Sequence, residues 1–125
     1  MTRVAQRADF TVTFETLKAI LAEYAPKLTV VRDEPGDYYL DAGYSEKWKK
    51  TICFGWVKTC KNYVSFYLMA VYGCPALLEG TSDELKKRMQ GKSCFNFKTV
   101  TPAQLKELKA LTKRGFEAYK RQGWV

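Results

Sequence analysis

Histidine is absent from this 125-residue chain. Its absence removes the commonest general base, the usual partner of a nucleophilic serine or cysteine, and the commonest transition-metal ligand. The four cysteines, at positions 53, 60, 74 and 94, form no Cys-x-x-Cys pair, so a structural zinc site would need ligands from distant segments. We therefore expect no catalytic residues of the common types, no metal site and no cofactor.

Long hydrophobic runs are also missing. The longest, Tyr63–Tyr72, is interrupted by Ser65 and falls well short of the ~20 apolar residues that cross a bilayer as a helix. The first residues, MTRVAQRADFTVT, lack the apolar core of ~7 to 15 residues that marks an export signal. We expect a cytoplasmic protein without a membrane partner and, because cytosolic redox buffers keep thiols reduced, with free cysteines.

Basic residues outnumber acidic ones, 21 to 13, which gives a net charge of +8. The field of such a surface favours anionic partners, although an excess of one sign also serves solubility. With 46% hydrophobic and 14% aromatic residues, the chain has the composition of a folded domain with one core.

The order of periodic segments predicts an α+β fold with an antiparallel sheet of about five strands and helices at both ends. Thr13 is placed to cap a first helix that ends before Pro26, so residues 1–12 are expected to form a mobile lead to a single domain over 13–125. Glu34-Pro35-Gly36 has the chemistry of a tight turn between two strands. The predicted elements are strands at 28–33, 37–42, 52–58, 63–72 and 93–98 and helices over 13–25, 81–91 and 101–122.

The two central predicted strands are apolar on both faces. Period-2 alternation places Phe54 and Trp56 on one face together with Tyr67, and Cys53 and Gly55 on the other. Such a sheet must be covered twice, by helices on one side and by something else on the other, or it leaves an exposed apolar groove.

A candidate ligand site follows from this second face. Aromatic side chains on a sheet face beside a loop suit an apolar or stacking ligand, and lysines with nearby backbone N–H groups suit an anion. The candidate residues are Trp48, Phe54, Trp56, Lys58, Tyr67 and Lys92. The alternative interpretation makes the aromatics a second core under a helix or a partner subunit, and Lys92 a solvated lysine after a helix-capping glycine.

Four lysines gather within ~60° of one another beside the apolar stripe of the last predicted helix: Lys106, Lys109, Lys113 and Lys120. They extend over ~20 Å at 1.5 Å per residue, long enough to follow a nucleic-acid backbone. Because Glu107 and Glu117 interrupt the helix surface and no nucleic-acid motif is present, a solvated face is favoured over a nucleic-acid partner.

A family resemblance is carried by three stretches: FGWVKTCKNYVSFYLMAVY, LLEGTSDELKKRMQGKSCFNF and GFEAYKRQG. They resemble the YdhG-like family, small bacterial domains mostly of unknown function and sometimes described as frataxin-like. The resemblance implies an α+β domain with helices packed on an antiparallel sheet, and it carries over no catalytic residues. Some relatives are described as iron chaperones, a role that in frataxins depends on an acidic surface. The positive charge of this chain opposes Fe²⁺, although Asp33, Glu34 and Asp37 could still bind a cation.

The sequence therefore favours a non-enzymatic binding or accessory module, monomeric or homodimeric, for an anionic small molecule or an acidic protein surface. A frataxin-like iron chaperone is one alternative. An enzyme that uses a cysteine thiolate activated by nearby lysines is another.

Overall fold

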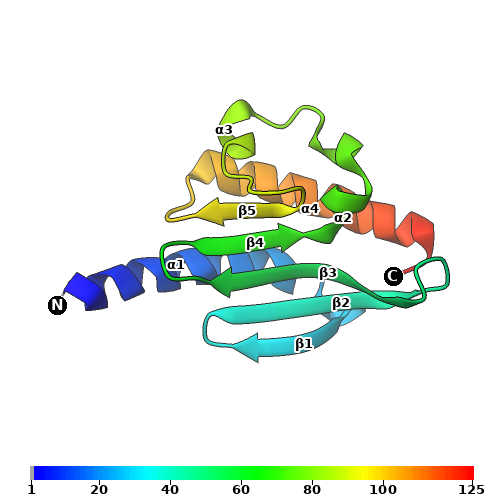
Figure 1. The fold of residues 1–125 in the computed structure, drawn as a ribbon, viewed down its shortest axis with the longest axis horizontal. Coiled ribbons are helices and arrows are strands. Elements are labelled where there is room, and N and C mark those ends of the chain that lie inside the picture. Colours follow the sequence, from blue (N-terminus) through cyan, green and yellow to red (C-terminus); the bar gives the residue numbers. More distant parts are fainter. Residues whose placement is uncertain (1) are drawn as a thin grey trace.

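The computed structural model describes residues 2–125, with side chains from Phe10 onward. The elements follow in the order α1 (Thr2–Ala22), η1 (Ala25–Lys27), β1 (Thr29–Glu34), β2 (Asp37–Ser45), β3 (Lys50–Thr59), β4 (Val64–Leu68), α2 (Met69–Gly73), η2 (Pro75–Leu78), α3 (Asp83–Lys86), β5 (Cys94–Phe97) and α4 (Pro102–Gln122). The five strands pair antiparallel in sequence order within one sheet (Figure 1). The predicted α+β class is confirmed.

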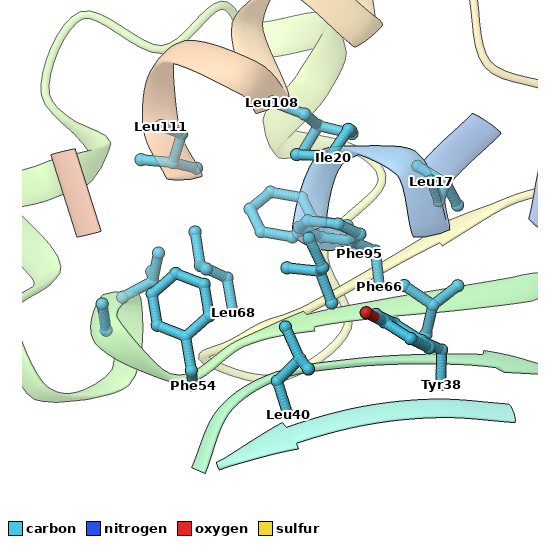
Figure 2. Packing of buried hydrophobic residues seen from close by; sticks show 14 of the residues in the cluster. Leu17, Ile20, Tyr38, Leu40, Phe54, Phe66, Leu68, Phe95, Leu108 and Leu111 are labelled. Atoms are coloured by element: carbon cyan, nitrogen blue, oxygen red, sulfur yellow. The ribbon is translucent and has the colours of Figure 1, made fainter. Parts of the chain in front are cut away.

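The two long helices lie on one side of the sheet. In Figure 1, α1 and α4 run behind the strands, and no described helix crosses in front of them. The core lies between these layers, where Leu17 and Ile20 of α1 and Leu108 of α4 meet Phe54 and Phe66 of the sheet (Figure 2). No helix in the part of the chain that the structure describes is both long and apolar enough to cross a membrane.

Local signals set several element ends as predicted. Gly36 has φ +78°, which closes the β1–β2 turn after Pro35. At the start of α4, the Thr101 hydroxyl accepts from the N–H of Gln104 at 3.1 Å, and the Gln104 side chain accepts from the N–H of Thr101 at 3.0 Å. This reciprocal capping box follows directly from the sequence. Gly123, with φ +79°, ends the helix in the left-handed region.

A β-bulge in β3 overturns the predicted face of Phe54. Leu40 pairs with Gly55 and Asp41 with Cys53, which leaves Phe54 as an extra residue in β3. Because one inserted residue reverses the alternation on one side of the bulge, Phe54 points into the core, where it is fully buried, and Cys53 lies opposite Asp41 on the other face. The prediction that Phe54 shares a face with Trp56 is therefore wrong.

Two predicted element ends also differ. The first helix begins at Thr2, and Thr13 lies inside it, where its buried hydroxyl donates to the carbonyl of Lys98 at 2.8 Å instead of capping. The predicted mobility of residues 1–12 falls largely outside the described side chains and stays a prediction. β4 ends at Leu68, because the next residues form α2 and bury Ala70 against α4.

The start of α3 is displaced by one residue from the predicted cap. Ser82, not Thr81, is the N-cap, and its hydroxyl accepts from the N–H of Leu85 at 3.2 Å. The backbone N–H of Ser82 in turn donates to Glu107 of α4 at 3.1 Å. This bond ties the start of α3 to α4.

The C-terminal residues return to the sheet. The N–H of Gly43 donates to the carbonyl of Trp124 at 2.7 Å, and the indole of Trp124 lies edge-on to Tyr119, with ring centroids 5.0 Å apart. A Cβ at position 43 would lie 2.8 Å from the Trp124 carbonyl oxygen. The absence of a side chain at Gly43 therefore allows this backbone contact.

Gly55 is the second position where a glycine permits close packing, here between β3 and α1. A Cβ at Gly55 would lie 2.7 Å from Leu21 Cδ2, and Leu21 is itself fully buried. We expect Gly55→Ala to lower the free energy of unfolding by about 1–3 kcal/mol through overpacking, measured by urea denaturation. Gly73→Ala is the matched control, because nothing lies within 4 Å of its Cβ position; equal stability of the two variants would contradict this packing.

Candidate functional site

The face of the sheet opposite the helices carries a row of three aromatic rings, which we call the aromatic strip: Tyr39, Trp56 and Tyr67. They come from β2, β3 and β4, and strand pairing places Trp56 directly opposite both tyrosines. Trp56 stacks on Tyr67 with ring centroids 5.0 Å apart and meets Tyr39 edge-on at 5.5 Å. All three rings are half-buried, so the strip offers a continuous apolar surface that its own chain leaves partly open.

Two cations lie over these rings. The Arg32 guanidinium of β1 is 4.8 Å from the ring centroid of Tyr39 and 5.4 Å from that of Trp56. The Lys58 ammonium is 5.3 Å from the Trp56 centroid. All three distances fall within the range of cation–π attraction, so positive charge is held at the strip itself.

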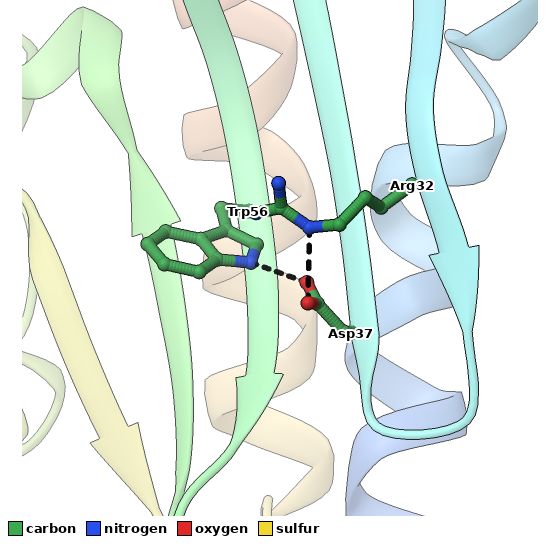
Figure 3. Close-up of polar contacts among 3 residues, drawn as sticks. All are labelled: Arg32, Asp37 and Trp56. Atoms are coloured by element: carbon green, nitrogen blue, oxygen red, sulfur yellow. Dashed lines mark hydrogen bonds and ion pairs between the residues drawn. The ribbon is translucent and has the colours of Figure 1, made fainter.

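Asp37 fixes the orientation of two of these groups (Figure 3). Its carboxylate accepts from the indole N–H of Trp56 at 2.7 Å and from Nε of Arg32 at 3.0 Å. One carboxylate at the start of β2 thereby sets the positions of an aromatic ring from β3 and a guanidinium from β1. Such shared hydrogen bonding preorganises a surface for binding.

The two cations on this face differ in whether they have an ion-pair partner. Arg32 is paired with Asp37, and the side chain of Asp41 lies close enough to Arg32 for the guanidinium to partly offset the burial that raises its pKa. Lys58 is exposed and makes no ion pair among the described residues. The Lys58 ammonium is therefore the charge at the strip that remains available to a ligand.

Two thiols also belong to this face, but neither resembles a nucleophile. Burial raises the pKa of Cys53, and a hydrogen bond from Tyr39 offsets this rise in part. Burial likewise raises the pKa of Cys94, against the opposing effect of hydrogen bonds with Ser65 and Tyr67. A raised pKa keeps both thiols protonated near neutral pH, whereas catalytic cysteines have lowered values.

Beyond Tyr67 the face becomes polar. The hydroxyl of Ser65 and the thiol of Cys94 both donate to Oδ1 of Asn96, at 2.7 and 3.3 Å. The amide nitrogen of Asn96 donates to the Gln90 side chain at 2.7 Å. This network satisfies the buried Ser65 hydroxyl and marks the end of the aromatic strip on the β5 side.

The structure brings together only part of the predicted site. Trp56, Lys58 and Tyr67 meet on the open face, whereas Phe54 lies in the core. Lys92 is exposed in the loop before β5 and makes no ion pair or ring contact with the strip among the described residues. The prediction that all of these residues share one site is therefore wrong for Phe54, and the structure gives Lys92 no contact with the strip.

Trp48 also lies away from the strip. It occupies the β2–β3 turn, where its backbone N–H donates to the Ser45 hydroxyl at 3.1 Å, and it is 57% exposed. The pair Ser45–Lys50 closes the hairpin beside this turn. The pair Tyr39–Trp56 lies six residues further along β2, so the turn and the strip are separated by roughly 20 Å at ~3.3 Å per residue.

Sequence analysis placed none of Tyr39, Arg32 and Asp37 at this site, and it named Asp37 only as a possible cation ligand. Each lies in a predicted strand, but only the pairing of β1, β2 and β3 shows that their side chains meet. A groove of about 580 Å³ lies away from the aromatic strip, between α1, where Phe10 and Phe14 line it, and the turns at 35–36 and 59–61.

Comparisons with protein-family models, curated proteins and solved structures found no match to this chain. The resemblance to the YdhG-like family accordingly stays a prediction. Among the described residues, no three cysteine, aspartate or glutamate side chains gather as metal ligands.

Thiol reactivity tests the environment assigned to Cys53 and Cys94. We expect both to react with iodoacetamide at pH 8 at least tenfold more slowly than in the urea-unfolded chain, because burial and a raised pKa both reduce the accessible thiolate. Quenched alkylation followed by peptide mass spectrometry gives each rate separately. A native rate equal to the unfolded rate at either position would contradict the assignment.

Proposed function

We propose that the protein is a non-enzymatic binding module that holds an aromatic anion against the aromatic strip. The observation that carries the proposal is the open sheet face, where three adjoining rings lie beside an ammonium group that has no ion-pair partner among the described residues. The apolar part of a ligand would pack on the exposed surface of Trp56 and Tyr67. Its negative charge would face Lys58.

The energetics favour a small ligand with both features. Stacking on an aromatic side chain contributes about 1–3 kcal/mol, and a charge-assisted hydrogen bond to an ammonium group is roughly twice as strong as a neutral one. Because Asp37 already fixes Trp56 and Arg32, little side-chain ordering remains to oppose binding. An aromatic carboxylate meets these requirements, with the N–H groups of Arg32 that Asp37 leaves free as a second anion contact.

Binding without catalysis is the simpler account of this face. Its buried thiols are held protonated, and the hydroxyl of Tyr39 has a pKa raised by burial, so neither group supplies a base or nucleophile at neutral pH. The cysteine-dependent enzyme and the iron chaperone remain predictions that no contact in the described residues favours.

The proposal is tested by nuclear magnetic resonance with isotope-labelled protein. We expect 1-naphthoate and indole-3-carboxylate to shift the indole N–H signal of Trp56 and the backbone signals of Tyr39 and Tyr67. The corresponding neutral amides, which keep the ring but lack the charge, should bind at least tenfold more weakly. Equal binding of acid and amide would remove the role given to Lys58.

Substitutions separate the aromatic strip from other surfaces. We expect Trp56→Leu and Lys58→Gln each to weaken binding of these carboxylates about tenfold or more, corresponding to ~1.4 kcal/mol. Trp48→Leu and Lys47→Gln are the matched controls, because they change the same residue types in the distant β2–β3 turn. Carboxylate affinities that respond equally to the two sets of variants would rule out the strip as the site.

A further inference from the structure

The positive charge of the chain is concentrated in its C-terminal third. Residues 83–125 contain eleven of the 21 basic residues but only four of the 13 acidic ones. Their net charge is +7, whereas the preceding 82 residues together carry +1. Within this segment α4 carries +4 and the connecting residues 87–93 and 98–101 carry +3 and +1, whereas α3 has a net charge of −1 and β5 has none.

Much of this charge lies on the solvent-facing side of α4. The lysines at positions 106, 109, 113 and 120 are all exposed, and none forms an ion pair among the described residues. Glu107 forms no ion pair with them among the described residues, and its carboxylate accepts the backbone N–H of Ser82 at 3.1 Å. Glu23, which follows α1, and Glu117, in the C-terminal half of α4, both lie close enough to Tyr24 to raise its pKa. Lys106 and Lys109 form no ion pair with Glu107, Glu117 or the α3 residues Asp83 and Glu84.

This surface and the aromatic strip face in opposite directions. Figure 1 shows α4 behind the sheet, whereas the strip lies on the face that no described helix covers. A single strand could not stack its bases on the strip and place the adjoining phosphates on α4. Single-stranded nucleic acid, which is usually held by stacking together with charge, therefore fits this arrangement less well than a duplex.

An anionic membrane fits less well for another reason. Peripheral helices that insert into a bilayer present large apolar side chains beside their lysines. The exposed residues of α4 next to the lysines include Ala103 and Ala110, whereas its large apolar residues Leu108, Leu111 and Phe116 are buried. The face offers charge without an inserting group.

We propose that the outer face of α4, centred on Lys106, Lys109 and Lys113, binds the phosphate backbone of double-stranded nucleic acid without reading its sequence. These lysines extend over ~10 Å along the helix at 1.5 Å per residue. One strand of a duplex presents about three phosphates over that length, at ~3.4 Å each. Three unpaired ammonium groups are thereby matched to about three phosphates, and no base contact is required. The proposal is independent of the aromatic-anion site.

Fluorescence anisotropy with a labelled 20-base-pair duplex of arbitrary sequence tests this proposal. Three phosphate contacts predict a slope of roughly −2.7 for log K against log salt, or about a 40-fold loss of affinity between 50 and 200 mM salt. A second duplex of unrelated sequence should bind within about threefold of the first, because phosphate contacts carry no sequence information.

The decisive variant is Lys106→Gln combined with Lys109→Gln and Lys113→Gln. We expect it to weaken duplex binding at least tenfold and to bring the salt slope close to zero. Glutamine is a good helix former, so circular dichroism should show an intact α4. The control combines Lys47→Gln, Lys50→Gln and Lys61→Gln, which removes the same charge from exposed positions at or next to the two hairpin turns and should reduce affinity less than threefold.

Several results would overturn the proposal. Equal losses in the two triple variants would show a response to net charge alone. The surface would be assigned to another partner if single strands bound more tightly than the duplex. The same would follow if phosphatidylserine vesicles or polyglutamate bound in place of the duplex. Trp56→Leu should leave duplex binding unchanged, so failure at one site is distinguishable from failure at the other.

Discussion

The extra residue in β3 is the constraint on which both faces of the sheet depend. With Phe54 inserted between two successive pairs, its ring enters the core and meets Tyr24 of the segment after α1 and Phe116 and Tyr119 of α4, with centroids 5.5–5.9 Å apart. Two residues later, Trp56 points the opposite way. The bulge thus allows one short apolar segment to anchor the helices and also to supply the central ring of an open surface.

The helix side and the open face of the sheet differ in how they arrange aromatic rings and charges. The helix side of the sheet buries its aromatics completely, and the excess charge stands outside it on α4, where water solvates each lysine. The open face keeps its charges close to aromatic rings and ties Arg32 and Trp56 to a single carboxylate, Asp37. α4 carries several exposed lysines without ion-pair partners among the described residues, whereas the strip has two cations, of which Arg32 is oriented by Asp37. The aromatic anion and the duplex proposed as ligands could therefore occupy the protein at the same time.

Sequence reasoning succeeded where the signal is local. The Thr101 capping box and the Pro35-Gly36 turn are each encoded within a few residues, and the α+β order follows from the periodicity of successive segments. All three predictions are confirmed. The bulge is not encoded in this way, because the residues around Phe54 are apolar and alternation reads equally well in either register. The meeting of Arg32 with Trp56 depends on pairing across three strands, which no single segment specifies.

The contact between Gly43 and Trp124 couples the two extremes of the fold. Because the amide of Gly43 donates to the carbonyl of Trp124, the far end of β2 holds the residues that follow α4. Fraying of the last helical turn would release that amide, and hydrogen exchange at one glycine in the sheet would therefore report the opening of a helix end. We therefore expect the two segments to open together, so that a side chain added at position 43 loosens the closing turn of α4 as well as the strand.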